Sequence, residues 1–277
     1  MNDSGYFEIS RPHPWLYAIK DRLAVYCWLV VGDKAALLFD AGYGIGDLPE
    51  AVMGITQKPL TIVLSHGHAD HVLGADQFNQ VYLHKADFTL YAEHSGPKWR
   101  QKAVDAIKLV KEPAGFDAES YLKREPAFLL PLEEGAVFDL GGIKPSAVHM
   151  PGHTAGSVGI LIKEHKVLLT SDAANRATFM FLPESQSIPC YLETLRKAVS
   201  LDFTVHFAGH QAAAYPKSWF DKYITVAENA LAGKGSPMTI PGFEEYAGTI
   251  VSMIDGPITS PSFCAVAYTA EKLEGFV

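Results

Sequence analysis

The stretch LTIVLSHGHADH, residues 60–71, decides the fold of this chain. Its first half, Leu60–Ser65, is a short and almost continuous apolar run, as expected of a strand buried on both faces. Its second half, His66–His71, places three histidines and one aspartate within six residues. Open α/β sheets form their sites at strand ends. We therefore expect an α/β fold with a polar site directly after this strand.

The spacing of these polar residues suits metal ligands. His66 and His68 alternate, so their side chains can point the same way while the chain is extended. Asp70 and His71 follow as the chain turns into a helix, so one short loop can serve two adjacent metals. Imidazole and carboxylate are ligands that suit zinc, iron or manganese. The competing interpretation, a polar helix-capping loop rich in histidine, does not require this HxHxDH spacing, and we favour a metal site.

Three later segments each place a further candidate ligand at the end of a predicted strand. The residues are His153 in PGHTAGS, Asp172 in LLTSDA and His210 in AGH. Singly these signals are weak, since His153 could be a loop histidine without a role and Asp172 a helix cap. Together with the first cluster they can converge on one sheet edge.

The remaining histidines carry a weaker signal. His13, His94 and His165 are predicted to lie on the surface. His149 stands four residues before His153 and could hold that ligand's other nitrogen. We favour an ordinary core or surface role for it.

Hydrophobic patterning surrounds the candidate ligands with strands and helices. Helical spacing predicts helices at Ile188–Leu201 and Tyr215–Ala232. The predicted strands are Leu16–Ile19, Leu23–Val31, Ala35–Phe39, Leu60–Ser65, Val137–Leu140, Lys144–His149, Val158–Ile162, Val167–Thr170 and Phe203–Phe207.

Two segments lie outside this alternation. Residues 97–125 begin with a basic amphipathic stretch, Pro97–Lys111, and are predicted to be a helical insertion. The extension 236–277 carries a predicted helix at Glu244–Ile254 and a predicted strand at Phe263–Thr269. Because an exposed apolar strand is an aggregation hazard, we expect this tail to pack on the rest of the chain. We expect residues 1–277 to form a single domain.

The composition is that of an ordinary globular protein, with 48% apolar and 19% charged residues. A net charge of −8 repels phosphate backbones, so we expect no nucleic-acid partner. The three cysteines are far apart and odd in number, which gives no disulfide framework. No signal peptide or bilayer-length apolar run is visible. We expect a soluble cytoplasmic protein with no membrane partner, and leave homo-oligomer formation open.

The order HxHxDH, GHT, SD and GH, which spans residues 66–210, resembles that of the metallo-β-lactamase superfamily. The Asp40-Ala41-Gly42 turn is similar to that superfamily's motif after its opening strands. The resemblance implies a four-layer αβ/βα sandwich with two metals at one edge. The implied ligands are His66, His68 and His153 for the first metal, Asp70, His71 and His210 for the second, and Asp172 as the bridge.

Particular positions discriminate between branches of the superfamily. Asp172 fits the glyoxalase II-like, lactonase-like and RNase Z-like branches, because zinc β-lactamases carry Cys or Ser there. His68 disfavours the flavodiiron branch, which has an acidic residue at that position. Asn175 stands where homoserine-lactone hydrolases have Tyr. The tail has few of the basic residues that glyoxalase II uses for glutathione, and the basic arm of tRNA-processing members is not visible.

The resemblance implies a hydrolase in which a metal-bridging hydroxide cleaves an ester, lactone, thioester or amide-type bond of a small molecule. Asp70 would orient that hydroxide or relay a proton. We expect two divalent metal ions, zinc first, with iron or manganese as alternatives. Three other interpretations stay open: a phosphodiesterase of the same fold, a persulfide dioxygenase with one iron, and a non-catalytic binding module. The sequence does not name the substrate. The apolar run Phe179–Phe181 either lines its pocket or belongs to the core.

Overall fold

The computed structural model describes residues 5–239, 248–252, 260 and 262–274. Seven strands form a first sheet in sequence order. The early strands pair antiparallel and the later ones parallel, with the change at β4–β5. The strands are β1 (Glu8–His13), β2 (Leu16–Lys20), β3 (Tyr26–Val31), β4 (Ala36–Phe39), β5 (Leu60–Val63), β6 (Gln80–His84) and β7 (Phe128–Leu132).

A second sheet has the order β13-β12-β10-β9-β8. Its centre joins β10 to β12 in parallel and to β9 in antiparallel. The strands are β8 (Ser146–His149), β9 (Val158–Ile162), β10 (Val167–Ser171), β12 (Val205–Ala208) and β13 (Tyr215–Pro216).

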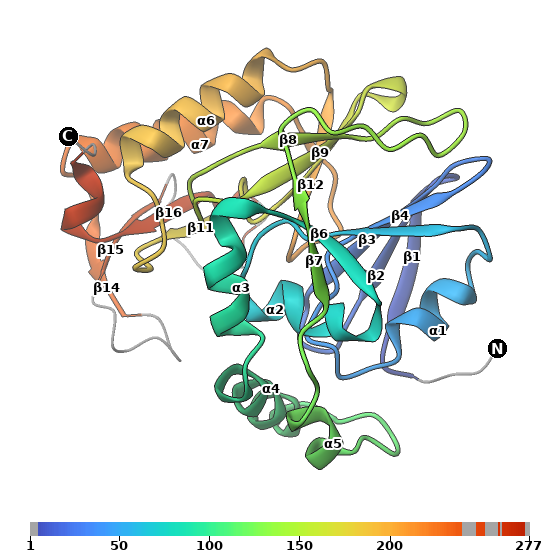
Figure 1. Cartoon of the computed structure of the whole chain (residues 1–277). Helices are drawn as coiled ribbons and strands as arrows, with labels where there is room; N and C mark the ends of the chain where they lie inside the picture. Colours follow the sequence, from blue (N-terminus) through green and yellow to red (C-terminus); the bar gives the residue numbers. More distant parts are fainter. Residues whose placement is uncertain (1–4, 240–247, 253–259, 261, 275–277) are drawn as a thin grey trace.

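Helices cover the outer faces of both sheets (Figure 1). The first sheet is covered by α1 (Leu48–Met53), α2 (Ala69–Val72) and α3 (Phe88–His94), and the second by α6 (Ile188–Ser200) and α7 (Trp219–Leu231). Between the sheets lies an apolar core that includes Trp28, Val63 and Phe207. Burying alternate strand residues against the partner sheet removes this apolar area from water. The chain therefore has the four-layer αβ/βα sandwich predicted from its sequence.

Three strands of the tail join β11 in a third sheet with the order β11-β16-β15-β14. Strand β16 lies between β11, which it joins in parallel, and β15, which it joins in antiparallel. The predicted strand at Phe263–Thr269 is confirmed, because Val266 and Tyr268 of β16 pack into the core below α6 and α7. The strands are β11 (Ala177–Met180), β14 (Ser236–Met238), β15 (Gly248–Ser252) and β16 (Ala265–Tyr268).

Several sequence-based boundaries were wrong. The predicted helix Glu244–Ile254 is contradicted at residues 248–252, which form β15 between β14 and β16; the rest of that range lies outside the described residues. Val137–Leu140 contributes only one isolated bridge, from Val137 to Ser146. The predicted helix at Tyr215 begins four residues later, because Tyr215–Pro216 pairs with β12.

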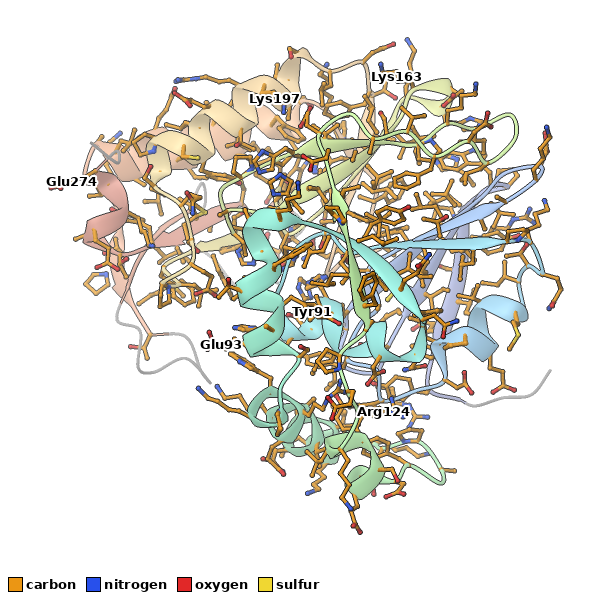
Figure 2. The ribbon with its side chains drawn as sticks, viewed as in Figure 1. Tyr91, Glu93, Arg124, Lys163, Lys197 and Glu274 are labelled. Atoms are coloured by element: carbon orange, nitrogen blue, oxygen red, sulfur yellow. The ribbon has the colours of Figure 1, made fainter. Side chains whose placement is uncertain are left out.

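The predicted helical insertion is confirmed as α4 (Pro97–Leu109) and α5 (Ala118–Leu122), which lie below α3 in Figure 1. A buried ion pair fastens it to the sandwich, with Arg100 Nη2 2.9 Å from Asp76 Oδ2. Arg124, labelled in Figure 2, donates a hydrogen bond of 2.9 Å to the carbonyl oxygen of Gly44. No helix among the described residues is long and apolar enough to cross a membrane.

Candidate metal centre

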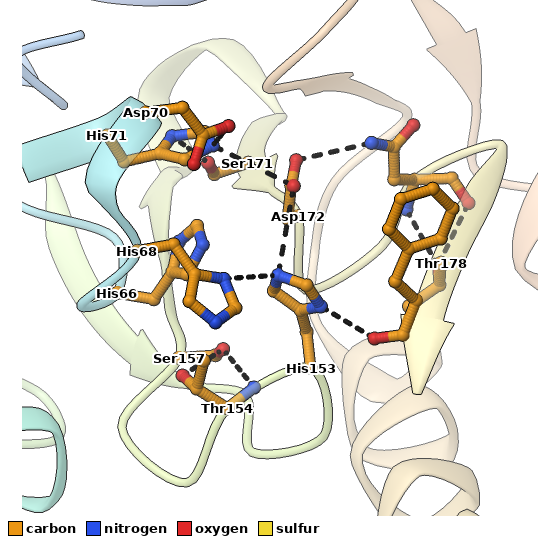
Figure 3. A network of polar contacts seen from close by, with 12 residues as sticks. His66, His68, Asp70, His71, His153, Thr154, Ser157, Ser171, Asp172 and Thr178 are labelled. Atoms are coloured by element: carbon orange, nitrogen blue, oxygen red, sulfur yellow. Dashed lines mark hydrogen bonds and ion pairs between the residues drawn. The ribbon is translucent and has the colours of Figure 1, made fainter. Parts of the chain in front are cut away.

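The seven predicted ligands come from four segments that meet at one edge of the sandwich, and Figure 3 shows six of them (His66, His68, Asp70, His71, His153 and Asp172). His66 and His68 lie in the loop after β5, and Asp70 and His71 begin the short helix α2. The other three follow strand ends: His153 after β8, Asp172 after β10 and His210 after β12. No helix begins at Asp172, so its interpretation as a helix cap is wrong.

These side chains form three overlapping groups whose candidate ligand atoms lie within 4.8 Å of one another. His66 belongs to two of these groups and His71 to two, so the three groups form one continuous cluster. The groups are His66, His68 and His153; His66, His71 and Asp172; and Asp70, His71 and His210.

The first group is tight and buried. His68 Nδ1 lies 2.9 Å from His153 Nε2, and the His66 ring centre lies 4.7 Å from that of His68. His66 Nε2 is buried without a hydrogen-bond partner, a condition that costs free energy unless another group satisfies the atom.

Asp172 occupies the middle of the cluster. Its Oδ2 lies 3.2 Å from His210 Nε2, 3.7 Å from His71 Nε2 and 3.8 Å from His153 Nε2. On the open side, Asp70 Oδ2 lies 3.2 Å from His71 Nε2 and 3.5 Å from His210 Nε2. The Asp172 carboxylate lies between His153 on one side and His71 and His210 on the other, so it is suited to bind two cations.

Four of the histidines have their outer nitrogen held by another part of the chain. This arrangement leaves the opposite nitrogen to face the common centre, as in metal sites where an outer partner fixes the ring's orientation. The contacts are His66 Nδ1 to Ser65 Oγ at 2.8 Å, His71 Nδ1 to Asp40 Oδ2 at 2.9 Å, His153 Nδ1 to the Phe179 carbonyl at 2.7 Å and His68 Nε2 to Glu184 Oε1 at 2.6 Å.

Asp40 lies beneath the candidate ligands and holds Ser65, His71 and Ser171 through hydrogen bonds, a role that sequence reasoning did not assign. Its fully buried carboxylate accepts hydrogen bonds from the Ser65 amide at 2.7 Å, the Ser65 hydroxyl at 2.9 Å and the Ser171 hydroxyl at 2.8 Å. Both Asp40 and Ser171 have positive φ, 70° and 46°, a conformation that costs free energy in residues other than glycine. The Asp40-Ala41-Gly42 turn was the only sequence signal for this network.

Asp87 joins the loop of His66 and His68 to the loop of His153. Its carboxylate accepts from the Gly67 amide at 2.9 Å, the Thr154 hydroxyl at 2.6 Å and the Gly156 amide at 2.6 Å. A Cβ on Gly156 would lie 2.6 Å from Asp87 Cγ, so only glycine permits this approach.

The prediction that His94 lies on the surface was wrong. The residue is only 6% exposed, its Nδ1 accepts from the Ala69 amide at 3.2 Å, and its ring stacks on Trp99 at 4.0 Å. Its ring centre lies 5.2 Å from that of His68. The insertion buries His94, because Trp99 belongs to α4. His149 contacts the Ala155 carbonyl at 2.9 Å.

Burial and charge divide the site electrostatically. Burial lowers the pKa of His66, and it lowers the pKa of His153 to about 4, so both rings are neutral at neutral pH. Burial opposes charge on His210 as well, but Asp172 and Asp70 raise its pKa to about 9. Burial raises the pKa of Asp172, and the neighbouring His210 and His71 more than offset this.

The residues therefore fit divalent metal ions. Neutral imidazoles and ionised carboxylates are the forms that bind metals, and metal binding displaces the protons that otherwise compensate buried carboxylates. His66 Nε2 is buried without a hydrogen-bond partner. His71 Nε2 is buried beside the carboxylates of Asp70 and Asp172 without a hydrogen bond to either, and both nitrogens belong to the groups above.

The fold and the clustered side chains define the class of the protein: an αβ/βα sandwich with a group of histidines and aspartates at one edge that could hold metal ions. The model of the metallo-beta-lactamase superfamily matches residues 21–210, and the chain belongs to that superfamily. It is 29% identical over 188 residues to the acyl-coenzyme A thioesterase MBLAC2 of Homo sapiens, covering 63% of this chain and 67% of that protein. It is 30% identical over 152 residues to the hydroxyacylglutathione hydrolase GloC of Haemophilus influenzae, covering 53% and 65%.

A solved structure supports the fold. A metallo-beta-lactamase family protein from Thermus thermophilus superposes with a TM-score of 0.57 at 21% identity, covering 85% of each chain. At this identity the likeness concerns the fold alone. The family match and the relatives that are named hydrolases make the chain a hydrolase of this superfamily, and its substrate has to be argued from its chemistry.

Proposed function

We propose that this protein hydrolyses thioesters of small molecules with two divalent metal ions, zinc being the first expectation. The observation that carries the proposal is the convergence of seven candidate ligand side chains, among which four histidines have their outer nitrogen held by another part of the chain. Two relatives support the thioester class, since one is named an acyl-coenzyme A thioesterase and the other a hydroxyacylglutathione hydrolase.

Each metal position follows from one part of the cluster. The first would be held by His66, His68 and His153, the second by Asp70, His71 and His210, and Asp172 would serve both. Bound divalent ions supply Lewis acidity, which lowers the pKa of water and polarises a carbonyl oxygen.

The chain's own contribution to the reaction centres on Asp70. Its side chain is 24% exposed, while its neighbour His71 is fully buried. Burial raises the pKa of Asp70, but His71 and His210 lower it well below its ordinary value, so the carboxylate is ionised. An ionised, partly open carboxylate can orient an attacking water and accept its proton. A thiol has a pKa of about 8.5, so the thiolate that leaves a thioester is stable enough to depart without protonation by an acid.

The net charge of the protein supports a small-molecule substrate over a nucleic acid. A net charge of −8 disfavours a polyanionic nucleic acid. The grouping of Asp70, His71 and His210 beside the first three histidines supports two metals over the single iron of a persulfide dioxygenase.

The test is a substrate panel with metal-loaded protein of measured metal content. The panel holds acyl-coenzyme A esters of increasing length, a hydroxyacyl-glutathione, oxygen esters, lactones and a phosphodiester, with thiol release followed by a chromogenic reagent. We expect close to two metals per chain and the highest kcat/KM on a thioester. Cleavage of the phosphodiester with no activity on any acyl compound would overturn the proposal, as would one metal per chain in the presence of excess metal.

A further inference from the structure

Glu184 contacts a predicted metal ligand, although 116 residues separate them in the chain. It lies in the loop between β11 and α6, and its Oε1 is 2.6 Å from His68 Nε2. The His68 side chain is 8% exposed and that of Glu184 is 24% exposed, so the contact lies at the rim of the site. A hydrogen bond this short, with a charged acceptor, belongs to the strong class.

This contact determines which nitrogen of His68 faces the centre. In a neutral imidazole one nitrogen carries the proton and the other accepts. A carboxylate only accepts, so Nε2 must carry the proton that it donates to Glu184. The lone pair is then on Nδ1, which lies 2.9 Å from His153 Nε2 in the first ligand group.

The loop that carries Glu184 is fastened on two sides. Toward the site, the Ser185 hydroxyl donates to the His153 carbonyl at 2.9 Å, and the Gln186 amide donates to the Gly152 carbonyl at 2.8 Å. Toward the tail, Lys272 Nζ donates to the carbonyls on either side of Glu184.

Lys272 belongs to the 3-10 helix η4 (Ala270–Leu273), which follows β16. Its Nζ lies 3.0 Å from the Pro183 carbonyl and 2.6 Å from the Ser185 carbonyl, and the residue is only 8% exposed. Burying an ammonium group is costly unless its protons are satisfied. Two convergent carbonyls accept two of its three protons, and these hydrogen bonds fix the backbone around Glu184.

We propose that Glu184 is a positioning residue that selects the metal-binding tautomer of His68, and that the tail residue Lys272 holds Glu184 in place. The proposal rests on the metal site of the proposed function. It gives the tail a part in the metal centre, although all seven ligands precede residue 211.

The first test measures the tautomer without any metal or substrate. Histidine 15N shifts of metal-free full-length protein report which nitrogen is protonated, and the His68 signals are identified by their absence in His68→Gln. We expect an Nε2-protonated His68 in the wild type and a mixture of tautomers in Glu184→Leu. Glu184→Gln should retain most of the wild-type pattern, because its amide oxygen still accepts. The same tautomer in wild type and Glu184→Leu would overturn the role of Glu184.

The second test measures zinc affinity by competition with a chromophoric chelator. Loss of such an outer partner weakens metal binding by about 10–100-fold, which is the range expected for Glu184→Leu, with a smaller loss for Glu184→Gln. Glu193→Leu on the exposed side of α6 is the matched control and should stay within about twofold of the wild type. If Glu184→Leu does not fold, Glu184→Ala takes its place, because it also removes the accepting oxygen. An affinity equal to wild type in that variant overturns the proposal.

A separate variant tests whether Lys272 holds Glu184 in place. Lys272→Met keeps the aliphatic stem and removes the donors, and we expect a zinc affinity lower by about tenfold. Lys163→Met is the control, because Lys163 lies at the far end of the second sheet in Figure 2. Unchanged affinity in Lys272→Met would overturn the role of the tail and leave that of Glu184. A wild-type protein that binds no metal would instead contradict the proposed function itself.

Discussion

At the scale of single residues, Asp172 is where the two candidate metal positions meet. Its Oδ2 approaches nitrogens of three histidines. Asp172 is the only ligand that the two metal positions would share, so its removal should weaken binding of the second metal. We therefore expect Asp172→Ala to lower metal content from about two per chain to about one and turnover by at least about 100-fold.

Elemental analysis, kinetics and a melting curve on this one variant test that expectation. Asp202→Ala, an exposed aspartate after α6, is the control and should match the wild type. Full metal content and wild-type turnover in Asp172→Ala would contradict a role for Asp172 in holding metal.

The residues around the site show where sequence reasoning stops. The spacing within His66–His71 predicted the ligands of this segment, because strand alternation and a helix start are short-range sequence patterns. Glu184 and Lys272 gave no such pattern, since their partners lie 116 and 87–89 residues away. His94 was placed on the surface because the polar helix end around it gives no sign that Trp99 covers it. Long-range polar contacts of this kind need coordinates.

At the scale of elements, Asp87 joins two ligand-bearing loops that belong to different sheets. It accepts two backbone amides and one hydroxyl, and the residue is buried. Asp87→Asn replaces one acceptor with a donor that faces these donors, so we expect a loss of about 2 kcal/mol in the free energy of unfolding.

Urea unfolding of metal-free protein measures this loss separately from any metal effect. Asp105→Asn on the exposed face of α4 is the matched control and should change the unfolding free energy by less than about 0.5 kcal/mol. Equal midpoints for Asp87→Asn and the wild type would contradict the role of Asp87 as a crosslink.

The tail sheet supplies a second prediction at this scale. Deleting residues 237–277 removes β15, β16 and most of β14, which exposes the edge of β11 and opens the core below α6 and α7. We expect aggregation, or a folded product with a Tm lower by at least about 10 °C and weaker zinc binding. A truncated protein with the wild-type Tm and zinc affinity would show that the tail is dispensable.

Some elements were readable from the sequence and others were not. The apolar strand Val158–Ile162 was predicted with the bounds that β9 has. Strands β1 and β7 were missed, because both are edge strands; in β7 Phe128 is 67% exposed and the apolar alternation is broken. The helix predicted at Glu244–Ile254 failed at β15, because Thr249, Ile250 and Val251 are β-branched and favour a strand, which here pairs with β16.

At the scale of the whole molecule, acid stability should depend on a histidine outside the metal centre. His206 of β12 is fully buried between the second sheet and α7, where its Nε2 lies 3.0 Å from the Tyr223 hydroxyl. Its ring packs against Phe220 at 5.0 Å. Burial in these surroundings lowers the pKa of His206 to about 3 from an ordinary value of 6.5.

A folded-state pKa below the unfolded value means that the unfolded chain binds the proton more readily. His206 therefore costs nothing above pH 6.5, and the fold loses stability as the pH falls from 6.5 toward 3. At pH 5 the loss is about 2 kcal/mol, from about 1.36 kcal/mol per pH unit below the unfolded pKa.

His206→Gln cannot titrate, so its unfolding free energy should fall by about 2 kcal/mol less than that of the wild type between about pH 7.5 and pH 5. Metal-free protein in both samples keeps the metal-site histidines equivalent, and His13→Gln serves as the control. Parallel pH curves for wild type and His206→Gln would mean that His206 is protonated in the folded protein without cost.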